Sequence, residues 1–277
     1  MKKLSLILFA ILIASIGNYC YAQRNQTVAK EIKEAFKART DTVNAQVIRF
    51  RETLISPEAS DSAALIIFLH GASGRGKDNL SQLAGNAVCD IYNYLQRKNI
   101  HAYFIAPQCP ETASWNGENS RDNRSRGNGM RPHRSPFEGG VENLKDNTPY
   151  IEHLMPFLEK YVSEHPISKS KIFIIGRSMG AAGTWLLIAK NPDYFQAALI
   201  SSGGYRGKNI APLLKTPVVC TVGTQENSYS RINELVGKLQ SSGADATIVP
   251  IYDADHKKAC DKSFTEENLD LLFSKHR

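Results

Sequence analysis

The sequence predicts an α/β protein with a mainly parallel central sheet and helices on both faces. Short runs of β-forming residues alternate with longer segments of helical spacing through most of the chain. Residues 64–69 are apolar at every position, which is typical of a strand that is covered on both faces. The chain has 277 residues, 42% of them hydrophobic and 22% charged, which is enough for one large domain or two small ones.

The N-terminal half begins with a charged segment of helical spacing, residues 28–39, which indicates an exposed helix. Residues 47–55 alternate between apolar and polar side chains, as strands with one buried face do. After the apolar strand at residues 64–69, helical spacing returns at residues 80–96. The β-forming run at residues 101–106 is then ended by a proline.

The C-terminal half continues the alternation with four more expected strands and four more expected helices. Residues 149–165 have helical spacing with an internal proline, Pro156, which we expect to kink the helix. The helix at residues 181–190 is followed by an Asn-Pro pair, which stops helices. The other strands are expected at residues 171–175, 196–201, 217–222 and 246–251, and the other helices at residues 228–240 and 265–275.

Residues 115–148 show neither period, and a stretch this long without secondary structure is usually functional or disordered. We expect one long loop insertion over the C-terminal edge of the sheet. Its arginines would clamp the carboxylates of a ligand in a bidentate manner, and a solvated loop is an equal alternative. The residues assigned to substrate binding here are Trp115, Arg121, Arg124, Arg126, Arg131 and Arg134.

The N-terminus predicts export. Two lysines precede an apolar run at residues 4–17, which is the order of a signal peptide and is too short for a membrane span. We expect residues 1–22 to be cleaved and residues 23–277 to form a single periplasmic or secreted domain without a stable membrane span. Lipidation at Cys20 is disfavoured, because the residue before it is not the small one that such a site needs.

Charge and cysteine content exclude some functions. Loss of the signal peptide lowers the formal charge from +7 to +5, which favours solubility over nucleic-acid binding, and no nucleic-acid motif is present. An exported protein permits disulfides between the four remaining cysteines, with free buried thiols as the alternative. Their spacing fits no zinc site, and we expect no metal or organic cofactor. The four are Cys89, Cys109, Cys220 and Cys260.

The stretch KIFIIGRSMGAAGTW, residues 171–185, conflicts with local propensity, because serine is a poor strand former and glycine weakens strands and helices alike. Such conflicts are expected at functional sites. The pattern G-x-S-x-G between a strand and a helix holds its serine in a strained turn with the hydroxyl exposed. Gly176 and Gly180 would leave room where side chains would clash. We assign Ser178 as a nucleophile, with a tight turn and a solvated serine as the alternative.

A serine nucleophile needs a base, and the base needs an orienting carboxylate. Both follow the serine along the chain in sites of this kind, the histidine last. Of the two later histidines, His276 lies at the C-terminal tip, so His256, after the last expected strand, is assigned as the base. Glu226 is the only acid in the segment that follows residues 217–222 and is assigned as the carboxylate. Asp253 and Asp255 are poorer candidates, because residues so close to His256 in sequence rarely fold back onto its ring.

An oxyanion hole needs two backbone N–H donors. Met179 follows the nucleophile and supplies one. The glycine-rich stretch at residues 69–76 follows an earlier strand, and we assign the second donor to Ala72. No Gly-Lys-Ser/Thr follows these glycines, so a nucleotide-binding loop is not expected. His70 is expected to brace this loop by hydrogen bonds.

Several blocks together resemble the α/β-hydrolase superfamily: FLHGASGRGKDN, APQCP with Trp115 after it, GRSMGAAGTW, NPDYF and DADH. The likeness runs from about Ala64 to His256. It is greatest to exported esterases of the feruloyl-esterase and polyhydroxybutyrate-depolymerase type and to related predicted peptidases. This resemblance implies the α/β-hydrolase fold and a Ser178–Glu226–His256 triad. Two departures are Glu226, where such proteins more often have Asp, and Ala181, where they often have a second Gly.

The function expected from these features is hydrolysis of carboxylic esters by a secreted or periplasmic serine enzyme. The resemblance points to acyl esters of polysaccharides, and it implies that the carboxylates met by the arginines belong to uronic acids. A small-molecule ester fits the same chemistry. A serine peptidase with the same triad is the enzymatic alternative. A relative that binds esters or glycans without catalysis is the alternative from another class, and it would be expected to lack a triad residue. The oligomeric state is not predicted.

Overall fold

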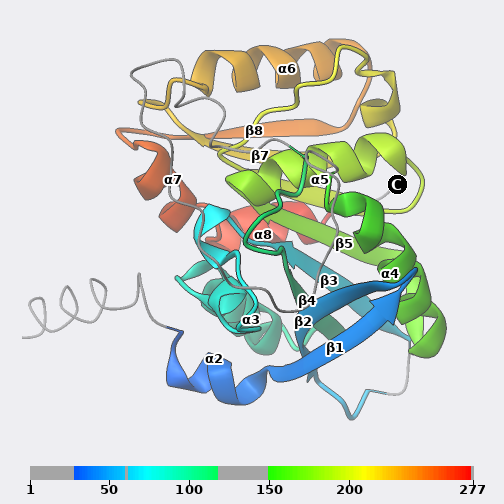
Figure 1. The fold of residues 1–277 in the computed structure, drawn as a ribbon. Helices are drawn as coiled ribbons and strands as arrows, with labels where there is room; N and C mark the ends of the chain where they lie inside the picture. The colour runs from blue at the N-terminus through cyan, green and yellow to red at the C-terminus, as the bar shows by residue number, and fades with distance from the viewer. Residues whose placement is uncertain (1–27, 60–61, 118–148, 276–277) are drawn as a thin grey trace, which may run out of the picture.

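The computed structural model describes residues 28–59, 62–117 and 149–275, and in these ranges an eight-stranded sheet forms the centre of the fold (Figure 1). The strand order is β1-β2-β4-β3-β5-β6-β7-β8, and neighbours run parallel except β1 with β2 and β2 with β4. This confirms the predicted, mainly parallel sheet. The strands are β1 (Lys37–Val43), β2 (Gln46–Ile55), β3 (Ala63–Leu69), β4 (Ala102–Gln108), β5 (Ile167–Arg177), β6 (Ala197–Ser201), β7 (Val218–Gly223) and β8 (Ala246–Ile251).

Helices cover both faces of the sheet (Figure 1). In β3, Leu65 and Ile67 face one core and Ala64, Ile66 and Phe68 face the other, because successive strand side chains point to opposite sides. The first core lies under α4 (Ile151–Glu164), α5 (Met179–Lys190) and α6 (Tyr229–Ser241). The second lies under α2 (Lys30–Ala35), α3 (Ala87–Arg97) and α8 (Glu266–Phe273). The continuous apolar run of β3 is thus explained by burial on both faces.

The helix expected at residues 28–39 is confirmed only in its first part. It ends at Ala35, and Lys37 begins an edge strand that pairs antiparallel with β2. The side chains of β1 are mostly exposed, so no buried alternation marks the strand in the sequence. Its stability comes from pairing with β2 across a tight turn at Asn44 and Ala45, where φ is 51° and 62°.

The other expected strands are present, and most of the expected helices differ only at their ends. The segment at residues 80–96 is the exception, because α3 begins only at Ala87. Gly85 before it has φ of 91°, which interrupts a helix. The sequence did not predict α7 (His256–Lys262) or the short 3₁₀ helices η1 (Ala72–Gly74), η2 (Ser81–Leu83) and η3 (Ala211–Leu214).

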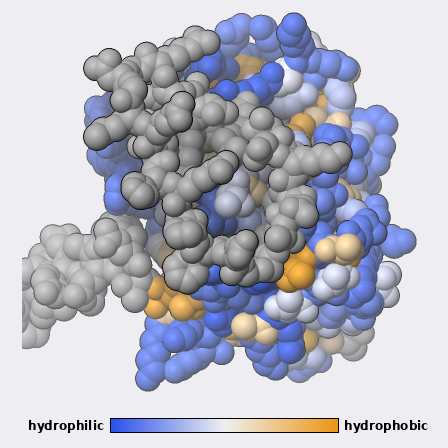
Figure 2. All heavy atoms as spheres, in the orientation of Figure 1, coloured by the Kyte–Doolittle hydropathy of each residue, from blue (hydrophilic) through white to orange (hydrophobic). Residues whose placement is uncertain are grey.

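The described surface is mostly hydrophilic in the view of Figure 2, with apolar side chains in small, separate areas. None of the described helices is both long and apolar enough to cross a bilayer. The cysteines follow the free-thiol alternative, since Cys89, Cys109, Cys220 and Cys260 are all buried and none is in a disulfide.

The centre of the sheet determines where a site can form. β3 and β5 are parallel neighbours, with Leu69 opposite Gly176, so the loops that leave their C-terminal ends start side by side. β6, β7 and β8 follow in order and run in the same direction. Open α/β sheets bind ligands at this edge, and the predicted nucleophile follows β5 there.

Candidate active site

Ser178 forms a sharp turn between the end of β5 and the start of α5. Its backbone has φ of 55° and ψ of −113°, which is unfavourable for a residue with a side chain. Its amide donates to the Ser201 carbonyl of the neighbouring strand, 2.8 Å away, which helps to hold the turn. The strained conformation expected from G-x-S-x-G is therefore confirmed.

The two glycines of the motif allow this turn because their neighbours are too close for a side chain. A Cβ on Gly180 would collide with the carbonyl oxygen of Leu69, and one on Gly176 would collide with Thr184 Oγ1 and the Gly180 backbone. These contacts pack α5 directly against the ends of β3 and β5. They confirm the expectation that Gly176 and Gly180 leave room for the strand and the helix.

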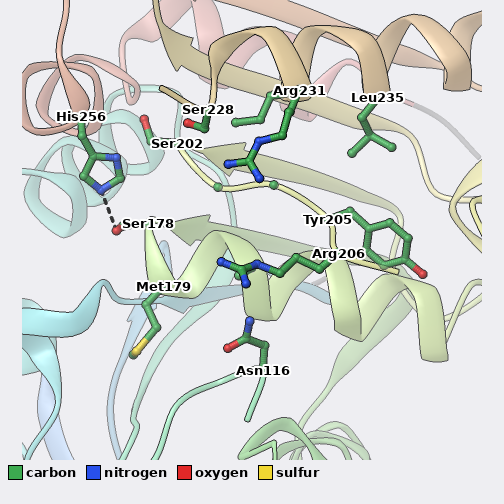
Figure 3. A pocket seen from close by; sticks show the side chains of 14 residues that line it. Asn116, Ser178, Met179, Ser202, Tyr205, Arg206, Ser228, Arg231, Leu235 and His256 are labelled. Carbon is green, nitrogen blue, oxygen red and sulfur yellow. Dashed lines mark hydrogen bonds between the residues drawn. The ribbon is translucent and has the colours of Figure 1, made fainter. Parts of the chain in front are cut away.

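The imidazole of His256 lies against the Ser178 hydroxyl. Its Nε2 is 2.8 Å from Ser178 Oγ (Figure 3). His256 is the first residue of α7, after β8, and the preceding Asp255 caps this helix by accepting from the Lys258 amide at 2.8 Å. Asp255 therefore has a structural role, and the ring of His256 is oriented by another carboxylate.

That carboxylate is Glu226, whose Oε2 is 2.7 Å from His256 Nδ1. The side chain of Glu226 is only 3% exposed, whereas that of His256 is 54% exposed. Glu226 Oε1 accepts from Ser202 Oγ at 2.7 Å and from the Gly223 amide at 2.9 Å. Burial raises the pKa of Glu226, but the hydrogen bonds from His256, Gly223 and Ser202 outweigh it, so its pKa lies below the usual range. The structure thus brings together the three side chains that the sequence assigned.

The two predicted oxyanion donors each begin a helical segment, one directly after Ser178 and one in the loop after β3. Met179 is the first residue of α5, so its amide has no partner within the helix. Ala72 is the first residue of η1, in the loop that follows β3. The residue before it, Gly71, is so close to Ser178 that a Cβ on it would contact the serine Cβ at 3.5 Å. The loop that carries Ala72 therefore approaches the turn that carries Ser178 and Met179, and the two amides remain the predicted oxyanion donors.

His70 braces the loop that carries Ala72, as the sequence predicts. The Cys109 amide donates to His70 Nε2 at 3.0 Å, which assigns the proton to Nδ1, and Nδ1 donates to the Gly71 carbonyl at 2.6 Å. Burial lowers the pKa of His70 to about 4. A neutral imidazole therefore ties the loop after β3 to the loop after β4.

Trp115 is placed differently from the expectation that it binds substrate. Its side chain is fully buried, and its indole Nε1 donates to the His70 carbonyl at 2.9 Å. It also packs against Tyr150 and against Gly183 of α5, where a Cβ would clash with it. Trp115 thus holds the backbone of His70 from within the core, where its large apolar ring is more stable than in water. The other residues assigned to substrate binding, Arg121, Arg124, Arg126, Arg131 and Arg134, lie outside the described residues.

A pocket of about 410 Å³ opens beside Ser178 and His256. Asn116, Arg206 and Arg231 line it together with Met179, and Figure 3 shows how these side chains surround the space. The sequence reasoning did not single out Ser202, Asn116 or the two arginines. The only signal was position, since Ser202 and Arg206 follow the C-terminal end of β6. The described residues contain no group of three or more His, Cys, Asp or Glu side chains that would hold a metal ion.

Known structures share this arrangement of strands and helices. A thermostable esterase superposes with a TM-score of 0.70 at 24% sequence identity, over 88% of this chain and 64% of that one. An S-formylglutathione hydrolase from Staphylococcus aureus gives 0.58 at 14% identity, over 86% and 95%. The fold is that of the α/β-hydrolases.

A feruloyl esterase module from Clostridium thermocellum, in complex with sinapinate, has the same α/β-hydrolase fold. It superposes with a TM-score of 0.55 at 14% identity, over 91% of this chain and 92% of that one. No family model matches the sequence, and no curated protein matches it. The chain spans less than two thirds of the thermostable esterase. These similarities establish the fold of the chain.

Proposed function

We propose that this protein is an exported serine hydrolase that cleaves carboxylic esters through an acyl-enzyme. The observation that carries the proposal is the continuous hydrogen-bonded chain from Ser178 Oγ to His256 to the buried Glu226. A strained serine, a histidine and a carboxylate in this order form the constellation of nucleophilic acyl transfer. Export is supported by the N-terminal sequence pattern at residues 1–22, which lies outside the described residues.

The first half of the reaction forms the acyl-enzyme and releases the alcohol. Nε2 of His256 takes the proton of Ser178 Oγ while the oxygen attacks the ester carbonyl carbon. The negative charge that develops on the carbonyl oxygen is held by the amides of Met179 and Ala72, which are fixed before the reaction begins. Glu226 keeps the proton of the imidazole on Nδ1 and stabilises the imidazolium. His256 then gives the proton to the leaving alkoxide, and the alcohol departs.

The second half repeats these steps with water. His256 takes a proton from a water molecule, the hydroxide attacks the acyl carbon, and collapse of the second tetrahedral intermediate returns the proton to Ser178. The side chain of His256 is 54% exposed, so water reaches the base from the pocket. Besides the ester and water, the reaction uses only the side chains of Ser178, His256 and Glu226 and the two backbone amides.

Acyl esters of polysaccharides are the proposed substrates. The resemblance to exported feruloyl-type esterases supports this class, and so does the shared fold with a feruloyl esterase module. Hydrolysis should be measured on p-nitrophenyl acyl esters, methyl ferulate, acetylated xylan and aminoacyl anilides, with the Ser178→Ala protein as the blank. Turnover of esters but not anilides, absent from Ser178→Ala, is the expected result. Faster turnover of anilides would favour the peptidase, and no turnover of any ester would contradict the proposal.

A further inference from the structure

Two guanidinium groups line the pocket beside the proposed nucleophile. Arg206 comes from the loop after β6, and Arg231 comes from the first turn of α6. In Figure 3 both guanidinium groups point toward the side of the pocket where Ser178 and His256 lie, while Tyr205 and Leu235 lie at the other end. The pocket therefore combines a positive wall with an apolar end.

The described lining of this pocket contains no carboxylate to balance the two positive charges. Glu234 and Glu226 are the nearest acids along the chain to Arg231, and neither lines the pocket. Glu234 pairs with Lys238 at 2.6 Å. The side chain of Glu226 is buried, and both its oxygens already accept hydrogen bonds. Arg206 also interacts with other parts of the protein. A guanidinium has five N–H donors in a planar fork, so an engaged one still has donors for a ligand.

The position of Arg231 does not stabilise its own helix. It is the third residue of α6, where the helix dipole disfavours a cation, and no acidic residue lies in that turn. Lys238 in the last turn of the same helix shows the opposite arrangement, because the dipole favours it there and Glu234 pairs with it at 2.6 Å. An anion bound at Arg231 would remove the unfavourable interaction.

We infer that this pocket binds a carboxylate carried by the ester substrate. The inference rests on the proposed function, since it names the class of ester that the same site would take. A carboxylate matches the fork of a guanidinium with two parallel hydrogen bonds. The body of the substrate would lie along Ile232, Leu235 and Tyr205, the apolar part of the lining. The carboxylate belongs either to the acyl group or to the alcohol, and two pairs of esters separate these sources.

Binding is measured first on Ser178→Ala protein by titration calorimetry, so that the result does not depend on turnover. For the acyl side, the p-nitrophenyl half-ester of adipic acid is compared with the p-nitrophenyl methyl diester. For the alcohol side, p-acetoxybenzoate is compared with p-acetoxybenzamide. The charged member of at least one pair should bind about tenfold more tightly, the size expected for charge-assisted hydrogen bonds at a partly exposed site.

The variant that tests the assignment is Arg206→Gln with Arg231→Gln in the Ser178→Ala background. The preference for the charged ester should fall to less than about twofold, and added salt should reduce it in the unmodified pocket. Arg97→Gln with Lys215→Gln removes two positive charges from exposed positions outside the pocket and is the charge-matched control. This control should keep the full preference.

Equal binding of both members in both pairs would overturn the inference, and so would a preference that survives loss of the two arginines or disappears in the control. In the protein with Ser178 intact, the same preference should appear in kcat/KM. Charged esters that bind preferentially but are not hydrolysed, with neutral esters also inert, would contradict the proposed function and leave the carboxylate site standing.

Discussion

Ser178 Oγ and His256 Nε2 lie 2.8 Å apart, although 78 positions separate the two residues in the chain. The sheet brings them together, because β5 delivers the serine and β8 delivers the histidine to the same C-terminal edge. Glu226 follows β7, which lies between β6 and β8 in the sheet, and its Oε2 is 2.7 Å from the other ring nitrogen of His256, Nδ1. The site therefore depends on the parallel order of β5 to β8 and not on any single loop.

Glu226→Gln should lower kcat by about 10²–10⁴-fold while the protein stays folded. Glu226 uses both of its oxygens to accept hydrogen bonds from Ser202, Gly223 and His256. Glutamine has an NH₂ group in place of one of these oxygens, and this group can only donate, so the three hydrogen bonds cannot all form. The expected loss is measured with a p-nitrophenyl ester at saturating substrate. Asp255→Asn is the matched control, because asparagine also caps helices and α7 should persist.

The assignment of the carboxylate would be wrong if Glu226→Gln retained wild-type kcat while Asp255→Asn or Asp253→Asn lost it. Circular dichroism of each variant shows whether a loss of activity comes from a loss of folded protein.

Two glycine substitutions should have opposite effects on stability. Gly180→Ala places a Cβ against the Leu69 carbonyl and should lower the free energy of unfolding by about 3 kcal/mol and reduce activity. Gly237 lies within α6, and a Cβ added there would have no atom within 4 Å. Gly237→Ala should therefore raise the free energy of unfolding by about 0.5–1 kcal/mol. Urea unfolding of both variants measures the difference. Equal stability of Gly180→Ala and wild type would show that α5 is not packed against β3 in this way.

His70 should make the protein less stable as the pH falls from 6.5 to 4. The folded protein holds this histidine neutral down to a pKa of about 4, whereas the unfolded chain takes up a proton near the usual value of 6.5. The unfolded state therefore binds more protons in this window, and the free energy of unfolding should fall by about 3 kcal/mol across it.

The measurement is urea unfolding of wild type and of His70→Gln at several pH values. Other groups also titrate in this range, so the prediction concerns the difference between the two proteins, which should shrink as the pH falls. A difference that stays constant from pH 6.5 to 4 would mean that His70 is not held neutral in the folded state.

Local signals in the sequence were sufficient for most of the fold and for the centre of the site. Ser178 was predictable because the five residues Gly-Arg-Ser-Met-Gly are poor formers of the strand and the helix that they join. Glu226 and His256 were predictable from their order along the chain, because parallel strands bring their C-terminal ends to one edge. None of these predictions required a contact to be known in advance.

What the sequence did not reveal depends on partners that are distant in the chain. β1 is an exposed strand stabilised by pairing with β2, so its side chains carry no pattern of burial. Arg206 and Arg231 resemble ordinary surface residues until β6 and α6 place them around one pocket. Trp115 was assigned to substrate binding, but its indole is used to hold His70, a contact across 45 positions.

Labelling by a fluorophosphonate probe, followed by mass spectrometry, tests the central claim most directly. The proposed site predicts one adduct per wild-type chain, located on Ser178, and none on Ser178→Ala, whose ester turnover should fall by about 10³–10⁶-fold. Ser170→Ala, on the exposed N-terminal part of the same strand β5, should label like wild type. Labelling that persists in folded Ser178→Ala protein, or a folded wild type that does not react, would contradict the account.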